Sequence, residues 1–189
     1  MPNDAELFLK HVEAVCGKKA DSFSRIDASE PEQPPVHVLF FHDVPESGYT
    51  TAVTFGLSLA NHPEWKVGKP ELLLCVQSAD ETWGEAVASV VEAFRGECPF
   101  RYGDVLHYGQ PIAPESAMSA FLIFAPALAA RWLTQEEATV SLPDRTVFLV
   151  GIYPLYEAEV ATLQRLGLEA FWNREGFAPW NVQRPALIP

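Results

Sequence analysis

The segment YTTAVTFGLS, residues 49–58, carries a β-branched and aromatic run that stops abruptly at Gly56. Such a run favours a strand over 50–55, and the glycine marks a bulge, a strand end or a close backbone approach. Two further apolar runs flank it, VHVLFF at 36–41 and ELLLCVQ at 71–77. Because the linking segments of 8 and 15 residues lack a helical pattern, we expect the three runs to pair as antiparallel strands.

The rest of the chain predicts helices and more strands around these three runs. Helical spacing of apolar residues favours helices at 4–16, 80–95 and 155–166, the first with a capping box at Asn3 and Glu6. Pro154 is expected to end one strand and open the third helix. Further strands are predicted within 103–112, at 119–125, and as a hairpin over 138–154. Together these elements indicate an α+β fold with a mostly antiparallel or mixed central sheet of about six or more strands, flanked by helices.

The pattern divides the chain into three parts. Residues 1–34 hold the first helix and a polar, proline-containing connector that begins at residue 18. Residues 35–175 form the main domain. Residues 176–189 make a proline-rich tail that we expect to wrap the surface or to be mobile.

The composition is acidic, with a formal net charge of −12. This charge opposes binding to nucleic acid and to anionic membranes, and it favours a basic protein partner. The sequence has no apolar stretch of the roughly 18–20 residues that cross a bilayer and no secretory signal pattern, so we expect a cytoplasmic protein. Three widely spaced cysteines suggest no metal site, and no cofactor is predicted. The sequence leaves the oligomeric state open.

A search for catalytic motifs leaves one weak constellation. Gly56 and Ser58 lack the second glycine of a hydrolase elbow, since position 60 is Ala60, and no dinucleotide or phosphate loop motif occurs. The residues His42, Asp43, Glu71 and His107 follow or begin predicted strands and could converge into an acid–base or metal site. A small hydrolase or metal enzyme is therefore an alternative. The opposing interpretation is that these are ordinary turn and edge residues.

Several aromatic residues lie in predicted loops or near element ends. Such residues either anchor a protein interface or cover the edges of a sheet. They are Trp65, Tyr102, Tyr108, Trp172 and Trp180.

The order of segments resembles the Suppressor of fused domain family. The resemblance rests on the T-x-G-x-S segment at 54–58, the GD…GQPI segment at 103–112 and the PL…E junction at 154–159, and it spans roughly residues 35–172. It implies an α+β domain that binds other proteins without catalysis, and no catalytic residues to carry over. Single-domain bacterial members resemble immunity proteins that neutralise a toxin. The larger animal members have a second domain, for which this chain is too short.

An acidic immunity protein would be attracted to a basic toxin, since carboxylates can stand in for phosphates in its cleft. We therefore expect a contact face of acidic residues with aromatic neighbours. A peptide-binding adaptor that accepts a strand at a sheet edge is a further alternative. The expected partner-binding residues are Asp43, Glu46, Tyr49, Asp80, Glu81, Glu85, Asp104 and Tyr108.

Overall fold

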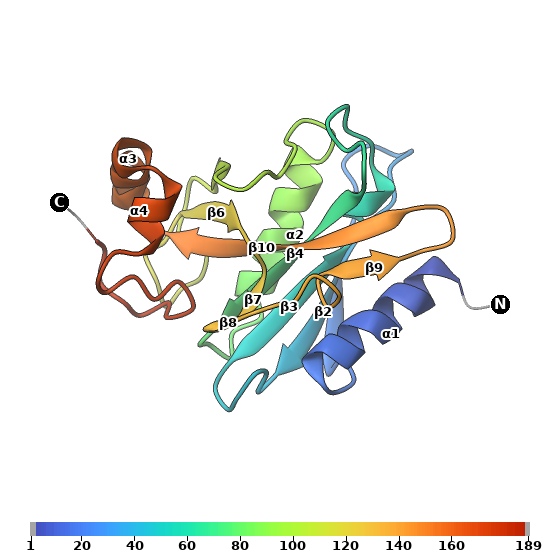
Figure 1. The fold of residues 1–189 in the computed structure, drawn as a ribbon, viewed down its shortest axis with the longest axis horizontal. Coiled ribbons are helices and arrows are strands. Elements are labelled where there is room, and N and C mark those ends of the chain that lie inside the picture. The colour runs from blue at the N-terminus through green and yellow to red at the C-terminus, as the bar shows by residue number, and fades with distance from the viewer. Residues whose placement is uncertain (1–2, 188–189) are drawn as a thin grey trace.

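The computed structural model describes residues 3–187, in which helices pack on a large mixed sheet (Figure 1). The helices are α1 (Asp4–Cys16), the short 3₁₀ helix η1 (Leu57–Leu59), α2 (Thr82–Phe94), α3 (Glu157–Leu166) and α4 (Leu168–Trp172). The strands are β1 (Ser22–Ile26), β2 (Val36–His42), β3 (Thr50–Phe55), β4 (Lys69–Val76), β5 (Val105–His107), β6 (Ala120–Phe124), β7 (Ala127–Leu128), β8 (Arg131–Trp132), β9 (Thr139–Ser141) and β10 (Thr146–Leu155).

The main sheet has eight strands, seven of them in the order β1-β2-β3-β4-β10-β6-β5. The predicted antiparallel pairing of β2, β3 and β4 is confirmed. β10 runs parallel to β4 and antiparallel to both β6 and β9, so the sheet is mixed. The predicted fold class is therefore confirmed, and the long β10 is the strand that joins the two halves of the sheet.

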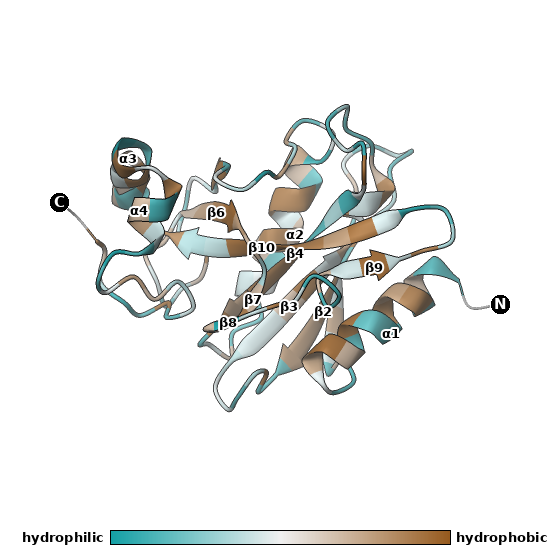
Figure 2. Ribbon diagram, viewed as in Figure 1, coloured by the Kyte–Doolittle hydropathy of each residue, from teal (hydrophilic) through white to brown (hydrophobic). Residues whose placement is uncertain are grey.

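Each face of the sheet buries its own apolar core. One core lies under α2, where Trp83, Val87 and Val91 pack against β2, β3 and β4. The opposite core lies under α1, where Phe8 and Val12 pack with the other side of the same strands. Figure 2 shows hydrophobic residues along β10 and on part of α1. Since alternate residues of a strand point to opposite faces, two covered faces explain why β3 and β4 are nearly continuous apolar runs.

Gly56 marks both a strand end and a close backbone approach, as the sequence indicated. It lies in a left-handed region, with φ 150°, directly after β3. A Cβ atom at this position would come within 2.9 Å of the Cα of Val36. The glycine therefore lets the chain turn from β3 into η1 against the start of β2.

Two expectations about element boundaries are wrong. The connector that begins at residue 18 contains a strand, β1, which pairs with β2. Only Phe23 and Ile26 of its five residues are apolar, so the sequence shows no apolar run there. β10 also continues through Pro154, and α3 begins only at Glu157. Because β4 pairs with β10 only as far as Gly151, the missing N–H of Pro154 interrupts no pairing with β4.

The residues after α4 pack against the domain and complete its surface. We call residues 173–187 the C-terminal segment. Within it Val182 and Arg184 are buried, and the carbonyl of Trp180 accepts a hydrogen bond of 2.7 Å from the backbone N–H of Gln77. The segment therefore covers the end of β4. None of the helices within residues 3–187 combines the length and the apolar character that crossing a bilayer requires.

Candidate functional site

Five aromatic side chains from distant parts of the chain meet beside β10. The ring of Phe124, at the end of β6, lies 4.6 Å from that of Trp172 and 5.7 Å from that of Trp132. Phe124 also contacts Tyr102 in an edge-to-face arrangement at 5.4 Å. The ring of Trp172 lies 4.8 Å from that of Tyr153. We call Tyr102, Phe124, Trp132, Tyr153 and Trp172 the aromatic patch.

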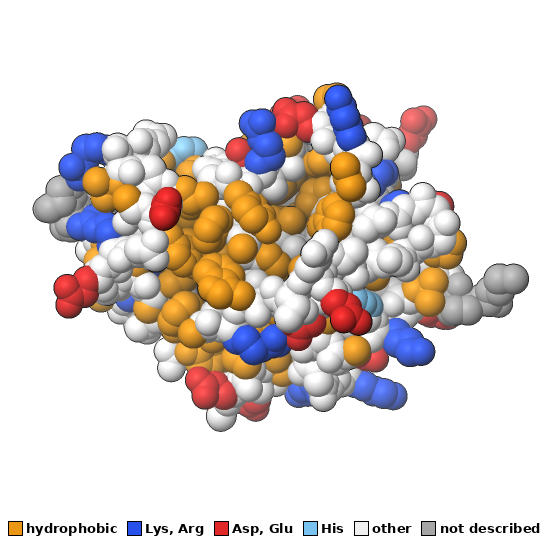
Figure 3. Space-filling view, in the orientation of Figure 1, with side chains coloured by type: hydrophobic (Ala, Val, Ile, Leu, Met, Phe, Trp, Pro, Cys, Tyr) orange, Lys and Arg blue, Asp and Glu red, His pale blue; other side chains and the backbone are white. Residues whose placement is uncertain are grey.

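The outer members of the aromatic patch are open to solvent although their rings are held in place. Tyr102 is 55% exposed and Trp132 is 46% exposed. Their contacts with Phe124 and Trp172 restrict their motion, because each ring leans on another ring. Figure 3 shows an apolar area in the middle of one face of the molecule. Fixed, exposed aromatic rings offer a large contact area at a small entropic cost.

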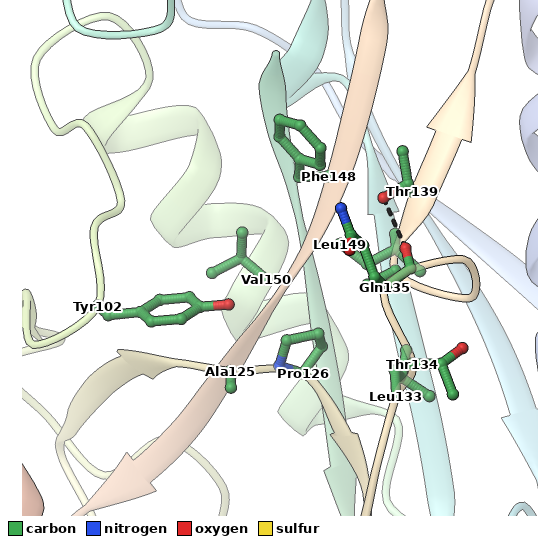
Figure 4. A pocket seen from close by; sticks show the side chains of 11 residues that line it. Tyr102, Ala125, Pro126, Leu133, Thr134, Gln135, Thr139, Phe148, Leu149 and Val150 are labelled. Carbon is green, nitrogen blue, oxygen red and sulfur yellow. Dashed lines mark hydrogen bonds between the residues drawn. The ribbon is translucent and has the colours of Figure 1, made fainter. Parts of the chain in front are cut away.

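Beside the aromatic patch is a hollow of about 420 Å³, which we call the β10 hollow (Figure 4). Most of its wall is apolar, and Tyr102, which also belongs to the aromatic patch, points toward β10 across it. The lining residues are Tyr102, Ala125, Pro126, Leu133, Thr134, Gln135, Ala138, Thr139, Phe148, Leu149 and Val150.

The β10 hollow exists because two strands share one edge of β10 and leave a gap between them. β9 pairs with β10 up to Phe148, and β6 pairs with it from Gly151 onward. The chain between β6 and β9 leaves the sheet at this point and forms the β7–β8 hairpin. In the register of β6, Pro126 would stand opposite Leu149, and proline has no N–H to extend the ladder.

Gly151 and Tyr153 fix the boundary between the β10 hollow and the aromatic patch. The hydroxyl of Tyr153 donates a 2.5 Å hydrogen bond to the carbonyl of Ala125. A Cβ atom on Gly151 would lie 2.5 Å from that carbonyl and 2.7 Å from the Tyr153 ring. Burial raises the pKa of the Tyr153 hydroxyl, which therefore remains a donor. A small residue at position 151 is thus needed for this arrangement.

The aromatic patch is supported from behind by a buried ion pair. The guanidinium of Arg184 meets the carboxylate of Glu159 with distances of 2.5 and 2.8 Å, and both side chains are almost fully buried. Arg184 also lies over the ring of Phe177, 4.9 Å from its centre, and Phe177 packs on Trp172 at 5.4 Å. The ion pair therefore fixes the C-terminal segment against the rings of the patch.

Of the residues predicted to bind a partner, Asp43, Glu46 and Tyr49 lie in or beside the turn between β2 and β3. Asp43 and Glu46 are exposed, whereas Tyr49 is buried, and burial raises the pKa of its hydroxyl. Glu46 and Tyr49 help to line a groove of about 290 Å³ together with Arg131 and Trp180.

Asp80, Glu81 and Glu85 lie at and near the start of α2. Asp80 accepts a 2.9 Å hydrogen bond from the N–H of Thr82, the first residue of α2. Glu81 accepts a hydrogen bond from Ser22 and lies 2.9 Å from Nε2 of His42. Glu85 is exposed. Of the three, Asp80 and Glu81 also have structural roles.

The last two predicted residues lie at the other edge of the sheet. Asp104 accepts a 2.7 Å hydrogen bond from the N–H of Arg101 just before β5, and the ring of Tyr108 packs edge-to-face on Phe121 after it. Five strand steps separate β5 from β2, which corresponds to about 24 Å. The eight residues are therefore not brought together in one cluster.

The residues of the catalytic alternative do not form one site. Glu71 is completely buried and accepts hydrogen bonds from the hydroxyl of Thr54 and the N–H groups of Gly56 and Ser58, at 2.6 to 2.8 Å. His42 and Asp43 lie at the opposite end of the strands. His42 pairs with Thr50 of β3, and Thr50 pairs with Val76, the last residue of β4. Five residues along β4 place that end about 17 Å from Glu71.

His107, the fourth residue of the alternative, lies on β5 and pairs with Glu157, with an N–O distance of 3.0 Å. Across the part of the chain that the structure describes, no group of three or more His, Cys, Asp or Glu side chains is arranged to hold a metal ion. The geometry therefore offers no support for the hydrolase or metal-enzyme alternative.

Sequence reasoning identified only part of the aromatic patch. Tyr102 and Trp172 were recognised as aromatic residues near element ends, and both belong to it. Phe124 and Tyr153 were missed because they sit inside apolar runs that read as ordinary core strands. Trp132 was missed because the short β7–β8 hairpin around it gives no strand pattern.

Solved structures share this fold. A homologue of Suppressor of fused from Neisseria gonorrhoeae FA 1090 aligns with a TM-score of 0.70 and 18% identity, over 95% of this chain and 94% of that chain. A chain of the Sufu–Fu complex aligns with a TM-score of 0.68 and 12% identity, over 97% of this chain and 91% of that chain. Drosophila Suppressor of Fused gives 0.67 and 13%, over 97% of this chain but 51% of that chain, so the present chain spans about half its length.

Sequence comparison gives the family directly. No curated protein sequence matches the chain. The family profile described as Suppressor of fused protein (SUFU) matches residues 32–186, which include every strand of the main sheet except β1 and the whole aromatic patch. Because this match covers most of the sequence, the chain belongs to the Suppressor of fused family.

Proposed function

We propose that this chain acts by binding another protein through the aromatic patch and the adjoining β10 hollow, without a catalytic step of its own. The observation that carries the proposal is the exposure of Tyr102 and Trp132 on a fixed stack of rings. Exposed aromatic residues beside an apolar depression are the usual centre of a protein interface, since they contribute most of the binding energy.

A similar structure supports protein binding as the mode of action, because it is that of a complex between Sufu and Fu. For the present chain we propose a basic partner, since the net charge of −12 would attract one. An immunity-type role, in which the chain neutralises a basic toxin, fits this charge and is the specific form of the proposal.

The experiment compares affinity capture from cells of the native host by three forms of the chain. The first is the unaltered protein, and the second carries Tyr102→Ser and Trp132→Ser. The third carries Val67→Ser, which removes an apolar side chain that is 84% exposed and lies outside the patch. The proposal predicts a protein that the first and third forms retain and the second loses.

Purified partner then allows direct measurement. We expect each single patch substitution to weaken binding at least tenfold, because central aromatic residues of interfaces typically contribute about 1.4 kcal/mol or more. If the captured protein is a toxin, an excess of this chain should also abolish its activity, and retention of full activity would reject the immunity role while leaving protein binding intact.

A further inference from the structure

We infer that the β10 hollow takes one bulky apolar side chain from an extended segment of the partner, and that a basic residue next to it in the segment reaches Glu136. This inference rests on the proposed function and specifies the chemistry of the partner. It is carried by three features of the hollow: its apolar wall, the break in the β10 ladder, and the charge at one rim.

The wall of the hollow matches an apolar group of side-chain size. Leu133, Ala138, Phe148 and Val150 contribute hydrocarbon surface, and Pro126 closes one side. The volume of about 420 Å³ leaves room for a phenylalanine or leucine side chain and part of the backbone that carries it. Burying such a side chain stabilises a complex by about 1.5–3 kcal/mol.

The break in the ladder offers the segment a backbone contact. Leu149 donates its N–H to the carbonyl of Ala138 at 2.8 Å, so its own carbonyl points to the same edge of β10. Pro126, which would stand opposite, has no N–H for that carbonyl. An extended segment that lies in the hollow can supply a donor at this position.

The charge at the rim favours a basic neighbour of the anchor. A second, shallower hollow lined by Gln135, Glu136, Thr139 and Ser141 shares Gln135 and Thr139 with the β10 hollow. Glu136 is exposed there, and none of the ion pairs found within residues 3–187 includes it.

Two other acidic or basic groups near this rim are already paired. Glu137 lies 2.9 Å from Arg131, and on the side of Tyr102 the guanidinium of Arg101 lies 3.1 Å from Glu64. A cation that follows the apolar anchor would therefore find Glu136 as its counter-charge, because the hollow that Glu136 lines shares two residues with the β10 hollow.

Small peptides test the inference without an identified partner. The probes are the blocked dipeptides acetyl-Phe-Arg-amide, acetyl-Phe-Gln-amide and acetyl-Ser-Arg-amide, titrated to millimolar concentrations while amide chemical shifts of the whole chain are followed by NMR. We expect saturable shifts at Ala125, Thr139 and Val150 with both phenylalanine probes. The arginine form should bind about two- to fivefold more tightly, and the serine probe should produce no such shifts.

Two variants separate the contributions. Glu136→Gln should remove the preference for arginine over glutamine and leave the binding of phenylalanine unchanged. Ala138→Trp should fill the hollow and abolish binding of both phenylalanine probes; Ala138→Leu serves the same purpose if the larger substitution disturbs the fold. Binding of the serine probe as tight as that of the phenylalanine probe, shifts confined to other regions, or no shifts at all would overturn the inference.

The captured partner distinguishes failure of this inference from failure of the proposed function. If the partner is lost on substitution of Tyr102 and Trp132 but binds the Ala138→Trp protein normally, the aromatic patch is the interface and the β10 hollow is not. If all forms bind alike, both statements fail. Loss of binding in both variants supports both.

Discussion

At the scale of single residues, Glu71 shows how a feature that resembles a catalytic group can be structural. Its buried carboxylate holds the end of β3 and the start of η1 by accepting three hydrogen bonds, two from backbone N–H groups and one from Thr54. Thr54 in turn accepts a 2.9 Å hydrogen bond from the N–H of Leu72. The abrupt stop of the apolar run at Gly56 is therefore organised by a residue of the neighbouring strand.

Substitution of Glu71 should reveal this role. Glu71→Gln keeps the size of the side chain but removes the charge. The two backbone N–H groups share one carboxylate oxygen, which the amide oxygen can replace, whereas the amide nitrogen cannot accept the hydrogen bond from the Thr54 hydroxyl. We expect a loss of about 2–4 kcal/mol in the free energy of unfolding, measured by urea denaturation. The exposed Glu85→Gln is the matched control and should change stability by less than about 0.5 kcal/mol. Equal midpoints for the two variants would contradict this account.

The buried thiol and hydroxyl groups predict sensitivity to alkaline pH. Burial raises the pKa of the Cys16 thiol to about 12, and it also raises the pKa values of Cys75 and Tyr153. In the unfolded chain a thiol ionises near pH 8.5, so above roughly that pH the unfolded state loses protons that the native state keeps. Stability should therefore be full below about pH 8.5 and should fall as the pH rises toward 12.

Urea midpoints measured between about pH 8 and pH 11 test this expectation. The midpoint should decrease across the range, and Cys16→Ser should decrease less steeply because serine does not ionise there. A midpoint that stays level, or a slope unchanged by the substitution, would show that Cys16 does not contribute.

At the scale of elements, β10 determines where the candidate site lies. It pairs with β4 along one edge and with β9 and then β6 along the other, and the gap between β9 and β6 forms the β10 hollow. The sequence predicted β10 as one arm of a hairpin, which is confirmed by its pairing with β9. Its parallel pairing with β4 could not be predicted, because it joins residues 78 positions apart and no local sequence pattern indicates such a contact.

The C-terminal segment is the second element that matters, and its ion pair provides a prediction. Arg184→Met removes the cation and leaves the buried carboxylate of Glu159 without its partner. We expect a loss of about 3–5 kcal/mol in the free energy of unfolding. The control is Arg165→Met on the exposed side of α3, for which the change should be small.

A second variant tests whether the cost arises from the unpaired charge. Glu159→Gln combined with Arg184→Met should recover part of the loss, because no buried charge is then left unpaired. Recovery will be incomplete since Glu159 also accepts hydrogen bonds from the N–H groups of Tyr156 and Leu187. A double variant less stable than Arg184→Met alone would reject this explanation.

At the scale of the whole molecule, the sequence predicted local features well and assembled surfaces poorly. The capping box of α1 and the antiparallel β2–β3–β4 unit follow from short patterns, and both are present. The aromatic patch draws on residues between positions 102 and 172, which meet only because β6, β10 and α4 pack together. No spacing rule connects such residues, so their proximity needed the structure.

The net charge provides a prediction at this scale. Replacing Asp80, Glu81 and Glu85 with lysine lowers the net negative charge by six. We expect this change to slow association with a basic partner at low salt and to weaken the dependence of the association rate on salt. Stopped-flow or surface-based kinetics measure this rate. Because Glu81 contacts Ser22 and His42, the single variant Glu85→Lys is the control for folding. An unchanged association rate would show that these acids do not belong to the contact face. Strong binding of the partner with little salt dependence would instead favour an adaptor that accepts a linear peptide.

The most direct test of the central claim is a calorimetric titration of the captured partner into the unaltered chain and into the protein carrying Trp132→Ser, with Val67→Ser as the control. The account predicts that Trp132→Ser weakens binding at least tenfold and that Val67→Ser leaves the dissociation constant within about twofold, since only Trp132 belongs to the aromatic patch. Equal affinities for all three proteins, with the folds intact, would show that the partner binds elsewhere and would contradict the account.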